Sequence, residues 1–318
     1  MPAAARIRPT DLFTPAEWAD LSRRNDWIGM GLVVHAWAIV ALAMAAAIWQ
    51  PLLIPIAVMV IGARQLGLAI LMHDAAHGGL HSNKRINDWV GQWLCAAPVG
   101  AHLGNYRPYH LQHHKFAQQP EDPDLNLSAP FPVTRGSLKR KIIRDLTGKT
   151  FLKQRSNQFA NALGLNLRPG KGTQNRIQGA REAVLPFLLT NIVLFAGLTV
   201  LGHWWAYFIL WLLPMATWNQ LVTRLRNIAE HAVVPDNEDP MRHARTTLAN
   251  PIEALLIAPY WVNYHCEHHM FMYLPCYRLG RAHRMLRKKG ITEQMEVRQG
   301  YIGVLTQAAS RPETLQPA

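Results

Sequence analysis

The chain has 318 residues, a formal net charge of +13 and an apolar fraction of 49%. This length allows one large domain or two small ones. The basic residues lie beside long apolar segments, which favours a membrane protein and argues against a nucleic-acid partner. Three cysteines, Cys95, Cys266 and Cys276, are too few and too widely spaced for a disulfide framework or a CxxC metal pair, and they fit a reducing compartment.

Four apolar segments follow one another along the chain in two pairs. The N-terminal eighteen residues contain charges but no apolar core, so we expect no signal peptide. Residues 27–49 and 51–72 form the first pair, and residues 183–201 and 204–221 form the second. Each segment is long enough to cross the hydrocarbon core as a helix, which predicts four transmembrane helices in two hairpins. The shorter apolar stretch 89–103 is expected to lie along the interface or to re-enter.

The two polar parts, residues 73–182 and 222–318, must lie on one side of the membrane because two spans separate them. Their basic residues assign that side to the cytoplasm. We therefore expect an all-α, multi-pass integral membrane protein of a bacterial-type inner membrane or its equivalent, with residues 1–318 in one domain and a helical cytoplasmic cap. The alternative is a soluble protein with four buried helices. Arg64 is costly inside the second span, and we expect it to face a protein partner or a polar cavity.

Histidines are the most informative residues. Of fifteen, eight form the boxes HDAAH, HLQHH and HCEHH, and His231 follows the fourth predicted span on the same side. Residues three or four apart share a helix face, so each box can direct its imidazoles to one point. One zinc ion needs only three or four protein ligands, so nine imidazoles predict two metal ions, whose identity the ligand type leaves open. The predicted ligands are His73, His77, His110, His113, His114, His231, His265, His268 and His269.

The order HxxxH, HxxHH, HxxHH resembles that of the membrane fatty acid desaturase family, with the boxes placed after the two predicted hairpins. The segments HHKFAQQPEDPDL and NYHCEHHMF, the latter followed by LPCYRL, strengthen a resemblance that covers roughly residues 64–283. It implies two iron ions, O2 as a co-substrate, and a histidine ligand after the fourth span, here His231. It also implies a separate electron donor, ferredoxin or cytochrome b5-like, because no cytochrome b5 segment is fused to either end.

Three polar residues are expected to support the metal ligands. The resemblance implies a water-mediated metal contact for Asn227, four residues before His231, although an asparagine there can also cap or pack a helix end. Asp122 and Asp124 are expected to orient imidazole N–H groups, and the alternative is an acidic pair in a turn. We expect no catalytic residue beyond the metal ligands.

Several other residues are less favoured as metal ligands or are assigned other roles. His81 lies four residues after His77, but two glycines separate them, so its role stays open. We expect Cys266, inside the third box, not to bind metal, because a thiolate would alter an all-nitrogen site. The basic run of residues 139–155 is expected to face lipid headgroups or to dock an acidic electron donor. The histidines that we expect to be non-ligands are His35, His102, His203, His243 and His283.

Three functions fit these patterns. The first is a desaturase acting on a fatty acyl or related lipid chain, with a membrane lipid or an acyl carrier as substrate. The second is a hydroxylase or ketolase of a hydrocarbon, carotenoid or lipid that uses the same histidines. The third is a histidine-rich membrane metal transporter or sensor, which is disfavoured because transport needs ligands inside the spans.

Overall fold

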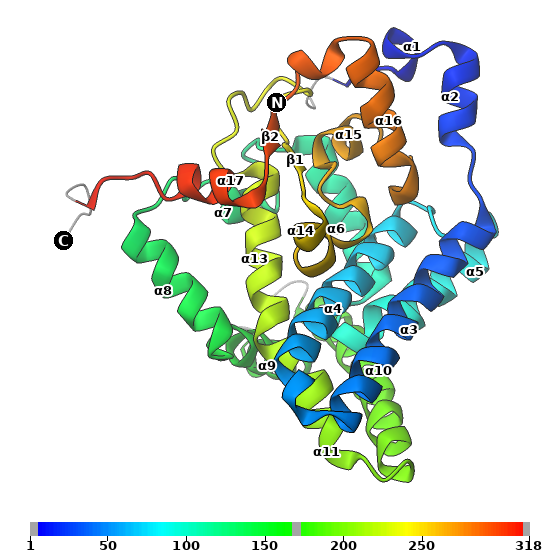
Figure 1. Cartoon of the computed structure of the whole chain (residues 1–318), viewed down its shortest axis with the longest axis vertical. Helices are drawn as coiled ribbons and strands as arrows, with labels where there is room; N and C mark the ends of the chain where they lie inside the picture. The colour runs from blue at the N-terminus through cyan, green and yellow to red at the C-terminus, as the bar shows by residue number, and fades with distance from the viewer. Residues whose placement is uncertain (1–5, 167–172, 314–318) are drawn as a thin grey trace.

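The computed structural model describes residues 6–166 and 173–313, and most of these residues are helical (Figure 1). Long helices α3, α4 and α10 extend toward one end of the molecule, where α11 lies beside them. Shorter helices and two short strands cover the other end. The predicted helical architecture is therefore confirmed in outline.

The first apolar pair forms α3 (Asp26–Trp49) and, after the short turn η1 (Pro51–Leu53), α4 (Ile54–Ala76). The Asn25 side chain caps the start of α3 by accepting the Ile28 N–H at 3.2 Å. Both helices agree with the predicted segments, but α4 continues four residues past residue 72. His73 therefore lies in the last turn of a long apolar helix rather than in the polar part that follows it.

The second apolar pair differs from the prediction. Its first member, α10 (Thr173–Val200), begins ten residues before residue 183. Its second member is divided into α11 (Trp204–Ala206), the π-helical η4 (Tyr207–Leu212), α12 (Leu213–Ala216) and the start of α13 (Trp218–His231). Thr217 separates α12 from α13 with φ −121° and ψ −84°, three residues after a proline that cannot donate a backbone hydrogen bond.

Three helical segments are long and apolar enough to cross a membrane: Asp26–Trp49, Pro51–Ala76 and Thr173–Val200. In the apolar windows of the first and third, 22% and 17% of residues are buried, against 56% in the second. The first and third segments thus present apolar surface outward, as helices facing lipid do, while α4 lies among other elements. The fourth span and the side of the membrane stay predictions.

The elements of the cap place the polar residues around the end of α4. The predicted interfacial stretch at 89–103 is a compact, largely buried set of short helical turns. Strands β1 and β2 pair in parallel, with Thr246 opposite Val297, and are the small exception to the predicted all-α fold among the described residues. The cap comprises α1 (Pro9–Leu12), α2 (Pro15–Ser22), α5 (Lys84–Val90), η2 (Gly91–Ala96), η3 (Ala97–Val99), α6 (Leu103–Phe116), α7 (Leu125–Ser128), α8 (Arg135–Leu146), α9 (Lys149–Ala162), β1 (Thr246–Leu248), α14 (Pro251–Leu256), η5 (Pro259–Trp261), α15 (His265–Met270), α16 (Cys276–Lys288), η6 (Ile291–Glu293), β2 (Val297–Gln299) and α17 (Tyr301–Ala308).

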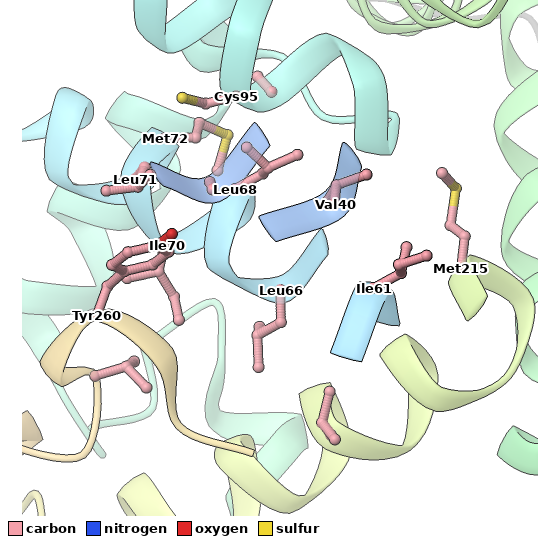
Figure 2. Packing of buried hydrophobic residues seen from close by; sticks show 14 of the residues in the cluster. Val40, Ile61, Leu66, Leu68, Ile70, Leu71, Met72, Cys95, Met215 and Tyr260 are labelled. Carbon is pink, nitrogen blue, oxygen red and sulfur yellow. The ribbon is translucent and has the colours of Figure 1, made fainter. Parts of the chain in front are cut away.

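The main apolar core surrounds α4 (Figure 2). Ile61, Leu68 and Leu71 are fully buried there, together with Cys95 of η2 and nearly all of Met215 of α12. Side chains from the apolar helices and from the cap therefore share one core. This packing holds the last turn of α4 in a fixed position relative to α6 and α13.

Candidate metal centre

Four helices bring nine histidines together at the buried end of α4. They form two clusters, and within each cluster one ring nitrogen per residue lies within 4.8 Å of every other. The nine are the same histidines that the sequence predicted as ligands. The first cluster is His73, His77, His110, His114 and His268, and the second cluster is His113, His231, His265 and His269.

Each HxxHH box contributes to both clusters, although helical spacing predicted a single point for each box. On α6, His110 and His114 are one turn apart and join the first cluster, whereas His113 joins the second. On α15, His268 joins the first cluster and His265 the second. Adjacent helical positions differ by about 100° around the axis, so a box of this spacing faces two points rather than one. The boxes on α6 and α15 thereby hold the clusters side by side.

The spacing of the ring nitrogens fits two metal ions. Nε2 of His114 lies 2.9 Å from Nε2 of both His110 and His268 in the first cluster. In the second, Nε2 of His265 lies 2.9 Å from that of His231 and 3.1 Å from that of His269. Two imidazoles bound to one ion at about 2.0–2.1 Å, at right angles to each other, have nitrogens about 3 Å apart.

Unpartnered nitrogen atoms also support metal binding. Nε2 of His73 and both ring nitrogens of His77 are buried without a hydrogen-bond partner among the described residues. Leaving such atoms unpaired costs about 1–3 kcal/mol each, and a bound cation would remove that cost. The residues present therefore fit a pair of histidine-bound metal ions.

The electrostatics of the clusters favour neutral imidazoles. Burial lowers the pKa of His110 and His114 well below the usual range, and repulsion from neighbouring histidines adds to the effect. The same two causes act on His268 and His269. A neutral imidazole has a free lone pair, so these side chains are ready to bind a cation at neutral pH without first losing a proton.

Polar contacts to the outer ring nitrogens orient three members of the second cluster. Nδ1 of His113 lies 2.8 Å from Oδ1 of Asp122, and Nδ1 of His231 lies 3.0 Å from the His243 carbonyl oxygen. Nδ1 of His265 is 3.4 Å from a carboxylate oxygen of Glu230. Such contacts fix which ring nitrogen faces a metal. Glu230 directly precedes His231, but no spacing rule pointed to a contact with His265.

The other two predicted supporting residues are placed differently from Asp122. Oδ2 of Asp124 is 3.9 Å from Nδ1 of His113, and its other oxygen accepts a hydrogen bond from the Tyr109 hydroxyl. Asn227 is half-buried and lines a cavity of about 210 Å³ that three members of the second cluster also line. Asp124 is therefore a more distant neighbour of the imidazoles, while Asn227 faces the space beside the second cluster.

Other histidines and Cys266 lie outside both clusters. His81 accepts the Asn83 N–H at 2.9 Å, on the loop after α4, so it does not extend the first box. Nδ1 of His283 lies 2.5 Å from a carboxylate oxygen of Glu267, and the Cys266 thiol contacts a backbone carbonyl.

His243 differs from the other histidines that were predicted to be non-ligands, because it lies beside the second cluster. Its ring centroid lies 5.3 Å from that of His269, and both of its buried ring nitrogens lack a hydrogen-bond partner. Together with His114 and His269, it lines a cavity of about 230 Å³ under the N-terminal segment. No partner histidine at helical spacing marks it in the sequence, so only the fold reveals its proximity.

Comparison with known proteins agrees with this site. The fatty acid desaturase family model matches residues 49–299, which contain all nine histidines. The chain is 26% identical to dihydrorhizobitoxine desaturase of Bradyrhizobium elkanii over 83% of its own length and 76% of the relative. It is also 27% identical to a β-carotene ketolase of Paracoccus sp. (strain PC1), over 80% of this chain and 87% of the relative. As the histidine boxes predicted, the chain belongs to the fatty acid desaturase family, whose members are oxidoreductases.

Proposed function

We propose that this chain is an O2-dependent di-iron desaturase that introduces a double bond into a fatty acyl or related lipid chain. The observation that supports it most is the pair of buried histidine clusters, whose nine nitrogen donors suit two metal ions. Iron is inferred from membership of the family, because imidazole by itself accepts several metals. The desaturase among the relatives favours the formation of a double bond.

In the overall reaction, a –CH2–CH2– unit loses two hydrogen atoms and becomes –CH=CH–. One O2 molecule takes up these two hydrogens together with two electrons and two protons, and forms two water molecules. Bound iron would supply the reduction of O2 and the oxidising power that an unactivated C–H bond requires. A separate one-electron carrier protein, ferredoxin or cytochrome b5-like, would provide the electrons.

The protein's own residues would hold and shield this chemistry. Asp122, the His243 carbonyl and Glu230 orient the three imidazoles that they contact, so the second cluster is preorganised. Burial of both clusters keeps bulk water away from the reacting atoms. Asn227, which lines the adjoining cavity, is proposed to hold a water molecule beside the second cluster.

The partners and placement are part of the same proposal. Four spans would anchor the chain in a bacterial-type inner membrane, with the clusters facing the cytoplasm and a membrane lipid or acyl carrier as substrate. Lys139, Arg140 and Lys153 are exposed on α8 and α9 and would face headgroups or an acidic electron donor. Arg155 belongs to the same basic run, but its guanidinium donates to the backbone oxygens of Val99 and Gly100 and so binds within the protein rather than to a partner.

A ketolase is the second candidate, because two relatives from Paracoccus are β-carotene ketolases. Both reactions begin by removing hydrogen from a methylene group, and the same histidines serve both. They differ in the product, since a ketolase converts –CH2– to a carbonyl group. The histidine clusters therefore do not separate the two reactions.

Product analysis tests the proposal. A host that expresses the chain should accumulate an unsaturated acyl product, and the purified protein should contain about two iron ions per chain. The His268→Ala variant removes a ligand from the first cluster, so it should abolish the product and lower the iron content while still inserting into membranes. His203→Ala, in the turn before α11, is the matched control and should keep both. A carbonyl product as the sole product would instead establish the ketolase, and full activity of His268→Ala would refute the ligand assignment.

A further inference from the structure

Arg64 is a charged side chain buried within an apolar helix. It is 4% exposed and lies ten residues into α4. Its Nη2 donates to the Leu255 carbonyl oxygen at 2.7 Å, and its guanidinium lies 5.3 Å from the centre of the Tyr260 ring. Its Nε is buried without a hydrogen-bond partner among the described residues, and its guanidinium contacts this carbonyl and this ring rather than a carboxylate. A buried, unpaired cation is costly, and such a group inside a membrane helix marks a functional site.

Arg64 borders a cavity of about 470 Å³ between α3, α4, α14 and η5. His35 and Tyr260 line the same cavity, and Nδ1 of His35 lies 3.0 Å from the Tyr260 hydroxyl. The walls are otherwise largely apolar and include Leu32 and Leu255. A guanidinium, an imidazole and a phenol thus line an apolar space, which is the composition of a pocket that orients a small polar group.

Tyr260 also separates this cavity from the histidine clusters. A second, much smaller cavity of about 20 Å³ is lined by Tyr260 on one side and by His73, His265 and His268 on the other. It has room for about one water molecule. Tyr260 is therefore the shared wall between a large pocket containing Arg64 and a small space that touches members of both clusters.

The position of Tyr260 depends on strain and close packing. It has φ 54° and ψ 45°, and Trp261 also has a positive φ of 57°. Such conformations cost a non-glycine residue about 1–3 kcal/mol, and they cluster at functional sites. The ring lies against α4 beside Ile70 (Figure 2), where a Cβ atom on Gly67 would be only 2.6 Å from Tyr260 Cε2. Gly67 thus allows an aromatic ring to sit between Arg64 and His73.

We propose that the Arg64 cavity binds the anionic end, a carboxylate or a phosphate, of a substrate whose hydrocarbon chain passes Tyr260 to the histidine clusters. Arg64 and His73 are nine residues apart on one helix, so about 13 Å of helix separates the two ends of this path. An arginine matches a carboxylate or phosphate with paired N–H donors, and Arg64 lines the cavity without a carboxylate partner among the described residues. The inference rests on the proposed function for what happens at the clusters, but binding of the anion does not require turnover.

Binding of matched probes tests this site. Hexadecanoate, hexadecyl phosphate and hexadecanol share a hydrocarbon chain and differ in charge, and each can displace a fluorescent fatty acid from the purified protein in neutral detergent. We expect at least one of the two anions to bind at least tenfold more tightly than the alcohol. Arg64→Gln should remove that preference. Arg155→Gln is the matched control, because Arg155 also donates to backbone carbonyls but lies outside this cavity, and it should keep the preference.

The two anionic probes separate the chemical sources. Preference for the carboxylate supports a free acid, and preference for the phosphate supports a phosphate-bearing lipid or carrier. Tyr260→Phe keeps the ring but removes the hydroxyl, so it tests the site if Arg64→Gln does not fold, and it should weaken anion binding several-fold. Equal binding of all three probes, or an unchanged preference in a folded Arg64→Gln or Tyr260→Phe protein, would overturn the proposal. A retained anion preference without unsaturated product would count against desaturation while supporting this site.

Discussion

Replacing Asp122 with asparagine tests how the second cluster is held. Asp122 is 5% exposed and accepts hydrogen bonds at 2.8 Å from His113 Nδ1 and from the backbone N–H groups of Gln118 and Asp124. An asparagine at this position has one oxygen and one NH2 group, so at least one of these donors would face another donor. Loss of a buried hydrogen bond to a charged group costs about 1.5–3 kcal/mol. Loss of a group that orients a metal-bound imidazole costs about 10–100-fold in metal affinity.

The assay for Asp122→Asn is iron content during titration with a chelator, followed alongside thermal unfolding in detergent. We expect one of the two proposed iron ions to leave at about 10–100-fold lower chelator concentration than in the parent protein, because only the second cluster contains His113. Asp124→Asn is the matched control, since Asp124 is 3.9 Å from His113 Nδ1 and should produce a smaller change. Identical chelator midpoints for the parent and Asp122→Asn, or equal shifts in the two variants, would refute the assigned role of Asp122.

Two further predictions concern packing. A Cβ atom on Gly29 would lie 1.9 Å from the Leu80 carbonyl oxygen, whereas one on Gly31 would meet nothing within 4 Å. Gly29→Ala should therefore lower the melting temperature, while Gly31→Ala should be neutral or stabilise by up to about 1 kcal/mol; similar melting temperatures for both would contradict this close approach. Glu296→Leu should destabilise the fold by about 3–5 kcal/mol because it removes the carboxylate 3.0 Å from the fully buried Arg245 side chain. The free energy of unfolding in denaturant measures this loss, and an Arg245→Leu, Glu296→Leu double variant should regain part of it because no buried charge is left unpaired. A double variant no more stable than Glu296→Leu would contradict an unpaired Arg245 charge as the cause.

Local pattern was enough to predict the long apolar helices and the histidines. The helices at Asp26–Trp49 and Ile54–Ala76 agree with the apolar segments because their composition leaves few alternatives. The fourth segment was less predictable. Thr217 interrupts its helix, and the apolar composition of a segment does not reveal a break in its backbone. Whether that segment crosses a membrane stays a prediction.

The candidate site was also predicted only in part from the sequence. Helical spacing identified His110, His113 and His114 as one group, but it did not indicate that His113 would turn to a different cluster from its neighbours. The proximity of His243 to His269 was also hidden, because the two residues come from segments whose contact depends on the fold.

The sequence by itself determined that the chain has long apolar helices, that it belongs to the fatty acid desaturase family, and which nine histidines to examine together. These properties depend on composition and on the spacing of neighbouring residues, and both can be read from the sequence without knowing the tertiary contacts. Only the tertiary structure decided how the nine divide into five and four, that Asp122 rather than Asp124 contacts His113, and that Tyr260 stands between Arg64 and the clusters. Each of these depends on the packing of helices distant in sequence, and helical spacing alone does not determine that packing.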